Sequence, residues 1–133
     1  MAAPRPRPAF TCPQGQGPDG SEDCPMTRGL GLLATKWTPP ILYHLHQAQQ
    51  PLRFSGLRRL IPAITQKELT KRLRELEANG IVSRQVFAEV PPRVEYALTE
   101  FGLTLEEPLG ALARWAMTHG HRLLTMRAAA KRA

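Results

Sequence analysis

The chain has 133 residues, a formal net charge of +7 at pH 7 and a sequence pI near 10.3. This length suits one domain with tails and is too short for two well-packed domains. The basic excess fits a polyanionic partner, because each contact to a phosphate releases condensed counterions, although net charge alone does not distinguish such a protein from a merely basic one.

Targeting and redox signals point to the cytoplasm. No apolar run approaches the roughly 20 residues that span a bilayer. Residues 1–8 are rich in Arg and Pro and lead into no apolar segment, so we expect no signal peptide, no membrane partner and a cytoplasmic, nucleoid-associated protein. The two cysteines, Cys12 and Cys24, are too few for a four-cysteine zinc site, and a structural disulfide is not expected in a reducing compartment.

Composition divides the chain into three parts. Residues 1–23 are rich in Pro and Gly and poor in large apolar groups, which predicts a flexible tail. Residues 24–119 carry apolar side chains at regular spacing and are predicted to form the folded domain. Residues 120–133 are basic and Ala-rich, and we expect a tail or a frayed continuation of the last helix.

Two helices are predicted first. Pro25 suits the first turn of a short helix that ends before Lys36. Thr38 is the expected N-cap of the next helix, because the two prolines after it lack amide donors that a first turn leaves unused. Residues 47–51 should form a loop. The apolar stripe predicted for this second helix consists of Ile41, Leu42 and Leu45.

A further short helix is expected after Arg53, ending at Pro62. The residues predicted to face inward from it are Phe54, Leu57, Leu60 and Ile61.

The strongest local pattern predicts a helix over residues 66–78. Thr65 and Glu68 have the spacing of a capping box, and Asn79-Gly80 is a typical C-terminal stop. The residues spaced to form one buried face are Leu69, Leu73 and Leu76.

Beyond Gly80 the apolar period changes from helical to two, which predicts a β-hairpin with its tip at residues 89–92. Two prolines in the tip exclude a tight two-residue turn. Polar Arg84, Arg93 and Glu95 are expected to alternate with the apolar strand residues. Those apolar residues are Val82, Val86, Val94, Tyr96 and Leu98.

One long C-terminal helix is expected last, capped by Thr99 and bent at Pro108. Its apolar stripe exceeds what one hairpin can cover, which favours pairing with a second copy of the chain. The stripe comprises Leu105, Leu109, Leu112 and Trp115 or Ala116.

Helices joined by a tight turn and followed by a hairpin are typical of a winged helix-turn-helix. We therefore predict a mainly α protein with a small β-hairpin wing (α+β) and with N- and C-terminal dimerisation helices. In this architecture the capped helix enters the major groove of double-stranded DNA, and the hairpin tip lies along the backbone or minor groove.

The placement of charge supports DNA as the partner. If the leucines of residues 66–78 face the core, a rotation of about 100° per residue puts Lys67, Lys71 and Arg74 on the opposite face. Further basic residues precede the turn and lie on the hairpin. The predicted DNA-contacting residues are Arg53, Ser55, Arg58, Thr65, Gln66, Lys67, Thr70, Lys71, Arg74, Arg84 and Arg93.

Other interpretations remain open. The basic helix face could be a solvated surface with ordinary Lys71–Glu75 and Glu68–Arg72 pairs. A winged helix can also serve protein–protein contact. An RNA-binding module is less favoured, because Phe87 and Tyr96 are both expected to point inward and leave no stacking platform.

An enzyme is the least supported class. His44 and His46 point to different sides of their helix and do not form a metal pair, and the adjacent acids Glu106-Glu107 are interpreted as solvated. The sequence thus predicts no catalytic residue, no metal site and no cofactor.

Several segments together resemble one known family. They include Thr35-Lys36-Trp37-Thr38, residues 64–69 (ITQKEL), residues 72–76 (RLREL) and residues 90–96 (VPPRVEY). This pattern, over residues 24 to about 118, resembles the HxlR-type winged helix-turn-helix family. It departs from the family at Pro39-Pro40, where apolar residues are usual, and at Gly56, where an acidic residue is common.

The resemblance implies a bacterial transcriptional regulator, often a repressor, that forms a homodimer through its terminal helices. The two-fold symmetry of such a homodimer predicts a palindromic operator. The resemblance also implies that Cys24, at the position before the first helix, senses a small reactive effector such as an electrophile or oxidant. A helix N-terminus favours the reactive thiolate, although most cysteines in folded proteins are simply small buried hydrophobes.

Overall fold

The computed structural model describes residues 21 and 23–132, so Cys12 and most of the predicted N-terminal tail lie outside the described residues. The elements, in chain order, are α1 (Pro25–Leu33), α2 (Thr38–Ala48), β1 (Leu52–Arg53), α3 (Phe54–Leu60), α4 (Gln66–Ala78), β2 (Val82–Phe87), β3 (Arg93–Leu98), α5 (Glu100–Leu103) and α6 (Glu106–Arg132).

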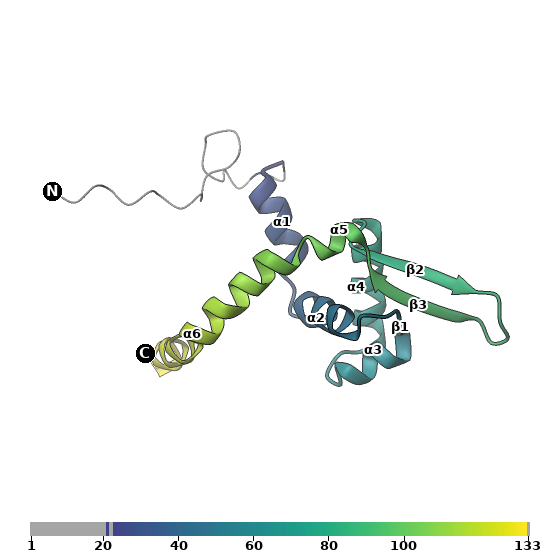
Figure 1. The fold of residues 1–133 in the computed structure, drawn as a ribbon. Helices are drawn as coiled ribbons and strands as arrows, with labels where there is room; N and C mark the ends of the chain where they lie inside the picture. The colour runs from purple at the N-terminus through teal and green to yellow at the C-terminus, as the bar shows by residue number, and fades with distance from the viewer. Residues whose placement is uncertain (1–20, 22, 133) are drawn as a thin grey trace.

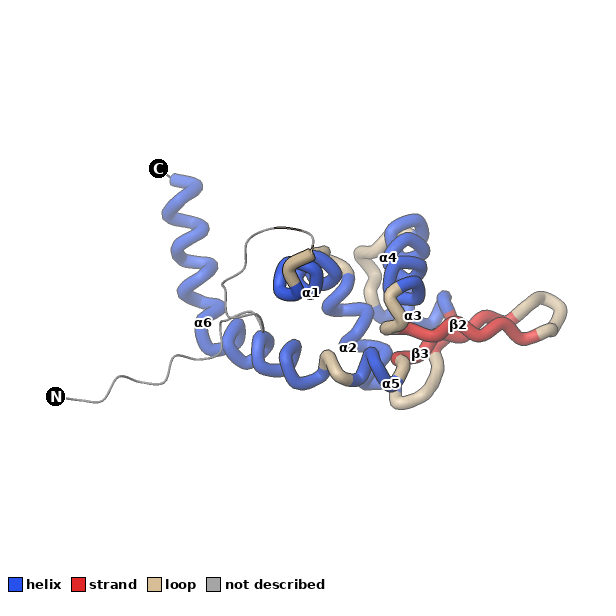
Figure 2. The backbone as a smooth tube through the Cα atoms, turned by 90° about the horizontal axis from the view of Figure 1, so that it is seen from above, coloured by secondary structure: helices blue, strands red, loops and turns tan. Residues whose placement is uncertain are grey.

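The predicted class, mainly α with a β-hairpin wing, is confirmed. Helices α2, α3 and α4 pack with the sheet around one core, and the β2–β3 hairpin projects from this body (Figure 1). Helix α6 leaves the body on the side away from the hairpin, as both views show (Figures 1 and 2). The fully buried side chains at the centre of the core include Ile41, Leu57, Leu69, Leu73, Leu76, Ile81 and Val82.

The start of α2 differs from the prediction that Thr38 is the N-cap. Thr38 is the first helical residue and is buried, and Trp37 occupies the cap position without a side-chain capping bond. The Thr35 hydroxyl accepts the Thr38 amide at 3.0 Å instead. A hydroxyl three residues upstream therefore satisfies the amide at this helix terminus. The helix also runs to Ala48, two residues into the predicted loop.

The sheet has three antiparallel strands in the order β1-β3-β2, and β1 was not predicted. This strand has only two residues, Leu52 and Arg53, paired with Tyr96 and Glu95 of β3. A two-residue strand is too short to show an alternating pattern. The adjoining α3 buries Leu57 as predicted, but Leu60 is 46% exposed, so its predicted inward orientation is wrong.

The hairpin strands were predicted correctly, but the predicted alternation of Arg84 with the valines is wrong. Arg84 lies directly opposite Tyr96, and Val82 and Val86 have the same parity along β2. Because side chains alternate along a strand, Arg84 shares a sheet face with the two valines. It is nevertheless exposed, on a strand that lies at the edge of the sheet.

The predicted single C-terminal helix is two helices. Thr99 caps the short α5, where its hydroxyl accepts the Gly102 amide at 2.9 Å, and α6 begins afresh at Glu106. Pro108 consequently lies in the first turn of α6, where a missing amide is harmless, and produces no kink there. Figure 2 shows α6 changing direction further along its length. The helix passes position 120 without interruption and reaches Arg132.

Helix α5 packs unusually close to the residue that follows the α4 turn. Gly102 is buried, and a Cβ atom built on it would lie 2.2 Å from the Ile81 carbonyl oxygen. The Thr99 amide donates to the same Ile81 carbonyl at 3.0 Å, and the Thr99 hydroxyl donates to the Gly80 carbonyl. Only glycine allows this approach of the two backbones.

We predict that Gly102→Ala destabilises the fold by about 1–3 kcal/mol, because the added methyl group overpacks against rigid backbone. The matched control is Gly56→Ala, where a Cβ atom meets nothing within 4 Å inside α3. That substitution should stabilise the protein by roughly 0.5–1 kcal/mol through helix propensity. The measurement is the free energy of unfolding in urea at one protein concentration, and equal stability of Gly102→Ala and parent would contradict this account.

Candidate nucleic-acid interface

Helix α4 exposes the side chains that the sequence predicted for DNA contact. Leu69, Leu73 and Leu76 are at most 1% exposed, so the rotation of the helix about its axis is fixed. The opposite face forms a shallow open hollow. The residues that line this face are Gln66, Lys67, Thr70, Lys71, Arg74 and Glu75.

Three cations on this face have no acidic partner among the described residues. Lys67, Lys71 and Arg74 are exposed, and no carboxylate of residues 21 and 23–132 lies within 4.0 Å of them. The predicted Glu68–Arg72 pair forms at 3.4 Å, whereas Glu75 contacts Arg72 at 2.9 Å rather than Lys71. The solvated-pair interpretation therefore holds for Arg72 and not for the outward-facing cations.

Two threonines of the predicted set already use their hydroxyl groups within α4. The Thr65 hydroxyl accepts the Glu68 amide at 3.1 Å and caps the helix. The Thr70 hydroxyl donates to the Gln66 carbonyl at 2.8 Å. Both hydroxyl groups therefore stabilise α4 itself through hydrogen bonds to its backbone.

A second group of predicted contacts lies on α3 and directly before it. Arg53 ends β1 and occupies the N-cap position of α3, and Ser55 and Arg58 follow on the helix. All three side chains are exposed, and so is Arg59. The sequence placed these residues just before the turn into α4, and the structure places them there.

The two arginines of the wing have different surroundings. Arg84 is exposed. The Arg93 side chain is 27% exposed, lies 3.4 Å from carboxylate oxygens of Glu89 and of Glu95, and stacks over the Phe87 ring at 4.1 Å. Tyr96 faces the core as predicted, but the predicted inward orientation of Phe87 is wrong, because Phe87 lies on the other face of the sheet, half-buried against Arg93.

Cys24 lies at the N-cap of α1 and is 6% exposed. Its amide donates to the Ser21 carbonyl at 3.1 Å, and its carbonyl accepts the Arg28 amide at 2.9 Å. The thiol is thus at the helix entry that the sequence predicted, but it is buried there.

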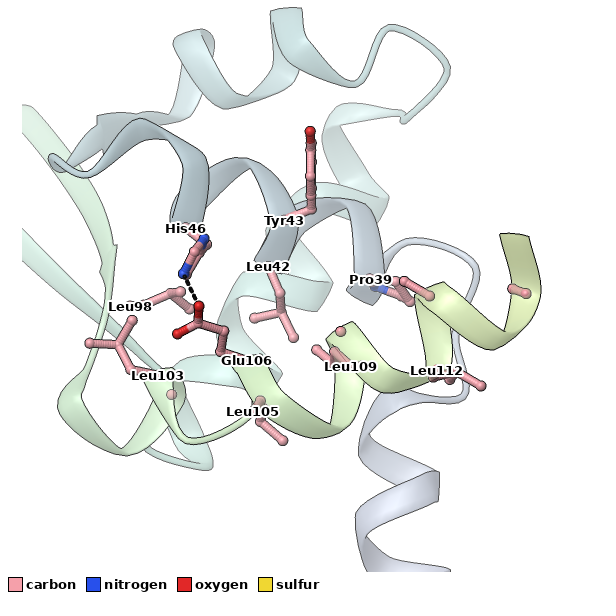
Figure 3. A pocket seen from close by; sticks show the side chains of 14 residues that line it. Pro39, Leu42, Tyr43, His46, Leu98, Leu103, Leu105, Glu106, Leu109 and Leu112 are labelled. Carbon is pink, nitrogen blue, oxygen red and sulfur yellow. Dashed lines mark ion pairs between the residues drawn. The ribbon is translucent and has the colours of Figure 1, made fainter. Parts of the chain in front are cut away.

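An apolar groove of about 460 Å³ separates α2 from α5 and α6 and was not predicted (Figure 3). One polar pair lies on it, His46 of α2 with Glu106 of α6 at 3.4 Å. Helix α6 itself has no buried residue among its 27. The large apolar side chains that it leaves exposed are Leu112, Trp115, Met117, Leu123, Leu124 and Met126.

Two further findings concern residues 21 and 23–132. They contain no cluster of three His, Cys, Asp or Glu side chains that could hold a metal ion. They also form no helix of the length and apolar character that a membrane span requires.

Known proteins show the same sequence pattern and fold. A model of the HxlR-like helix-turn-helix family matches residues 32–123. The HTH-type transcriptional regulator YdeP of Bacillus subtilis (strain 168) is 42% identical over 113 residues, which cover 85% of this chain and 87% of YdeP.

Solved structures of redox-responsive regulators are also similar. The redox regulator HypR in its reduced form has a TM-score of 0.69 and 42% identity, over 76% of this chain and 98% of HypR. Diamide-treated YodB from B. subtilis has a TM-score of 0.61 and 38% identity, over 74% of this chain and 96% of YodB.

We predict that Thr65→Ala lowers the free energy of unfolding by about 1 kcal/mol, because the Glu68 amide loses its acceptor at the start of α4. Thr65→Ser keeps the hydroxyl and should remain within a few tenths of a kcal/mol of the parent. Urea unfolding of both variants checks this. Parent-like stability of Thr65→Ala would mean that the cap contributes nothing.

Proposed function

Since the chain belongs to the HxlR-like helix-turn-helix family, we propose that it binds a specific DNA operator as a homodimer and represses transcription there. The observation that carries this proposal is the outward face of α4, where three cations lack acidic partners among the described residues. Such a face is suited to a major groove lined by acceptors and flanked by phosphates. Relatives of the chain such as YdeP are described as transcriptional regulators.

The proposed contacts divide by chemistry. Arg74 and Lys71 have the donors for guanine, and Gln66 in the first turn can pair with adenine. Arg53 at the N-cap of α3 and Arg58 in its last turn are proposed to hold phosphates, which position the protein without reading sequence. Thr65, Lys67, Thr70 and Ser55 lie beside these groups, and Arg84 supplies the exposed cation of the wing.

The exposed apolar face of α6 supports dimerisation. Leu112 is 57% exposed and Trp115 is 51% exposed, and a helix of this length with no buried residue would leave a large apolar surface in water. The groove beside α6 continues this surface into the body (Figure 3). We assign the second copy of the chain as the partner that covers it.

Redox or electrophile sensing through Cys24 is the second part of the proposal. Its support is the position of the thiol at the entry to α1 and the similarity to HypR and to diamide-treated YodB. Because Cys24 is only 6% exposed, any modification of its thiol would insert bulk among packed side chains. Such a change at the N-terminal helix would alter how two copies pack and thereby release DNA.

Selection of bound duplexes from a random DNA pool tests operator binding. We predict enrichment of an inverted repeat, and we expect Arg74→Ala to weaken binding to it by about 1–3 kcal/mol at fixed salt, through loss of a bidentate guanine contact. The control is Arg122→Ala, which removes an equal charge from α6. Failure to enrich any sequence would favour a winged helix used for protein–protein contact.

We predict that Leu112→Glu weakens the homodimer by roughly tenfold or more, because a carboxylate would be buried without a partner. Thr125→Glu is the control, since it places the same charge at an exposed polar position of the same helix. Sedimentation velocity over a range of protein concentrations measures both dissociation constants. Equal effects of the two variants, or a monomeric parent at micromolar concentration, would rule out this face as the interface.

We predict that diamide or a quinone lowers operator affinity of the parent on the order of tenfold, and that Cys24→Ser removes this response. The comparison with Cys12→Ser separates the two thiols. A parent indifferent to both reagents, or a Cys24→Ser variant as responsive as the parent, would leave Cys24 as a packing residue.

A further inference from the structure

Arg93 differs from the other predicted DNA-contacting residues because its guanidinium is enclosed by its own wing. Its Nη2 atom lies 3.4 Å from Glu89 Oε1, and its Nε atom lies 3.4 Å from Glu95 Oε1. Its Cζ atom stands 4.1 Å above the Phe87 ring. The side chain is 27% exposed, although it lies at the outermost pair of the hairpin.

These contacts tie three parts of the wing together. Phe87 lies directly opposite Arg93 on β2, and Glu95 follows two residues along β3, on the same face of the sheet. Glu89 belongs to the tip. A planar guanidinium can stack on a ring and form ion pairs at its edge, so one side chain joins the tip to both strands.

The charges of the wing give this arrangement a consequence for DNA binding. Residues 82–98 contain two cations, Arg84 and Arg93, and two acids, Glu89 and Glu95, so the formal charge of the hairpin is zero. The Glu89 carboxyl is 50% exposed at the tip. Without Arg93 beside it, this carboxylate would stand uncompensated where the wing meets the phosphate backbone, and like charges would repel.

We propose that Arg93 is a positioning residue of the wing, which neutralises Glu89 and fixes the tip, and not a phosphate contact. This proposal rests on the proposed DNA-binding function. The contacts of the wing with DNA then come from Arg84 and from the tip itself, where the Val90 side chain is fully exposed. An apolar tip on a neutral hairpin suits the sugar edges of a minor groove better than a phosphate.

A double-mutant cycle on the selected operator tests the proposal. We expect Arg93→Gln to lower affinity about fivefold, because it exposes the Glu89 charge to phosphate. In the Glu89→Gln background the same substitution should lower affinity less than about twofold, since the exposed carboxylate of the tip is absent and the remaining Glu95 carboxylate, set back on β3, is only 22% exposed. A phosphate contact predicts no coupling or coupling of the opposite sign, that is, an equal or a larger loss once Glu89 no longer competes for the guanidinium.

Arg84→Gln is the matched control, and its loss of affinity should be the same in both backgrounds, because Arg84 has no carboxylate partner among the described residues. If Arg93→Gln lowers the urea midpoint, Arg93→Met keeps the aliphatic stem over Phe87 and replaces it in the cycle. An equal or larger loss from Arg93→Gln in the Glu89→Gln background overturns this proposal alone. A parent that binds no selected duplex overturns the proposed function and this proposal with it.

Discussion

Burial of the α4 leucines is the constraint on which the DNA-facing surface depends. Leu69, Leu73 and Leu76 are enclosed by side chains of α2, α3 and the start of β2. Each fully buried leucine contributes about 1.5–3 kcal/mol, so any rotation that turned this stripe toward water would be unfavourable. The cations at the intervening positions must then point outward. The core thus fixes the direction of the basic side chains, and no specific contact among them is needed to hold them there.

Secondary-structure elements that depend on neighbouring residues alone were predicted correctly from the sequence. The bounds of α4 follow from a cap three residues before an acid and from a glycine after the last turn, and Gly80 indeed has a φ of 74°. Elements that depend on contact with a segment distant in the sequence were not predicted. β1 exists because β3 lies beside it, and the break between α5 and α6 accompanies the contact of Gly102 with the Ile81 backbone. Neither contact leaves a periodic pattern in the chain.

The same distinction applies to the candidate site. Composition and helical spacing identified Lys67, Lys71 and Arg74, because the helix fixes which residues share a face. They did not show that Arg72 and Arg93 are held by carboxylates, since the side chains around Arg93 come from two strands and the tip between them. A basic residue becomes available for phosphate only when its neighbours leave it unpaired. Counting cations along the sequence therefore overestimates the positive charge of the wing.

The contact between Thr99 and the α4 turn links the two proposed roles of the protein. The Thr99 hydroxyl donates to the carbonyl of Gly80, directly after α4, while Thr99 also caps α5, which leads into α6. Gly102 packs directly against the Ile81 backbone at the same place. Because these backbones pack without a side chain between them, α5 is held against the end of α4, and the Leu105 amide, which donates to the Gly102 carbonyl at 3.1 Å, continues the chain from α5 into α6. A change in how two α6 helices pair would accordingly move the two α4 helices relative to each other, and half-site spacing on DNA is sensitive to that displacement.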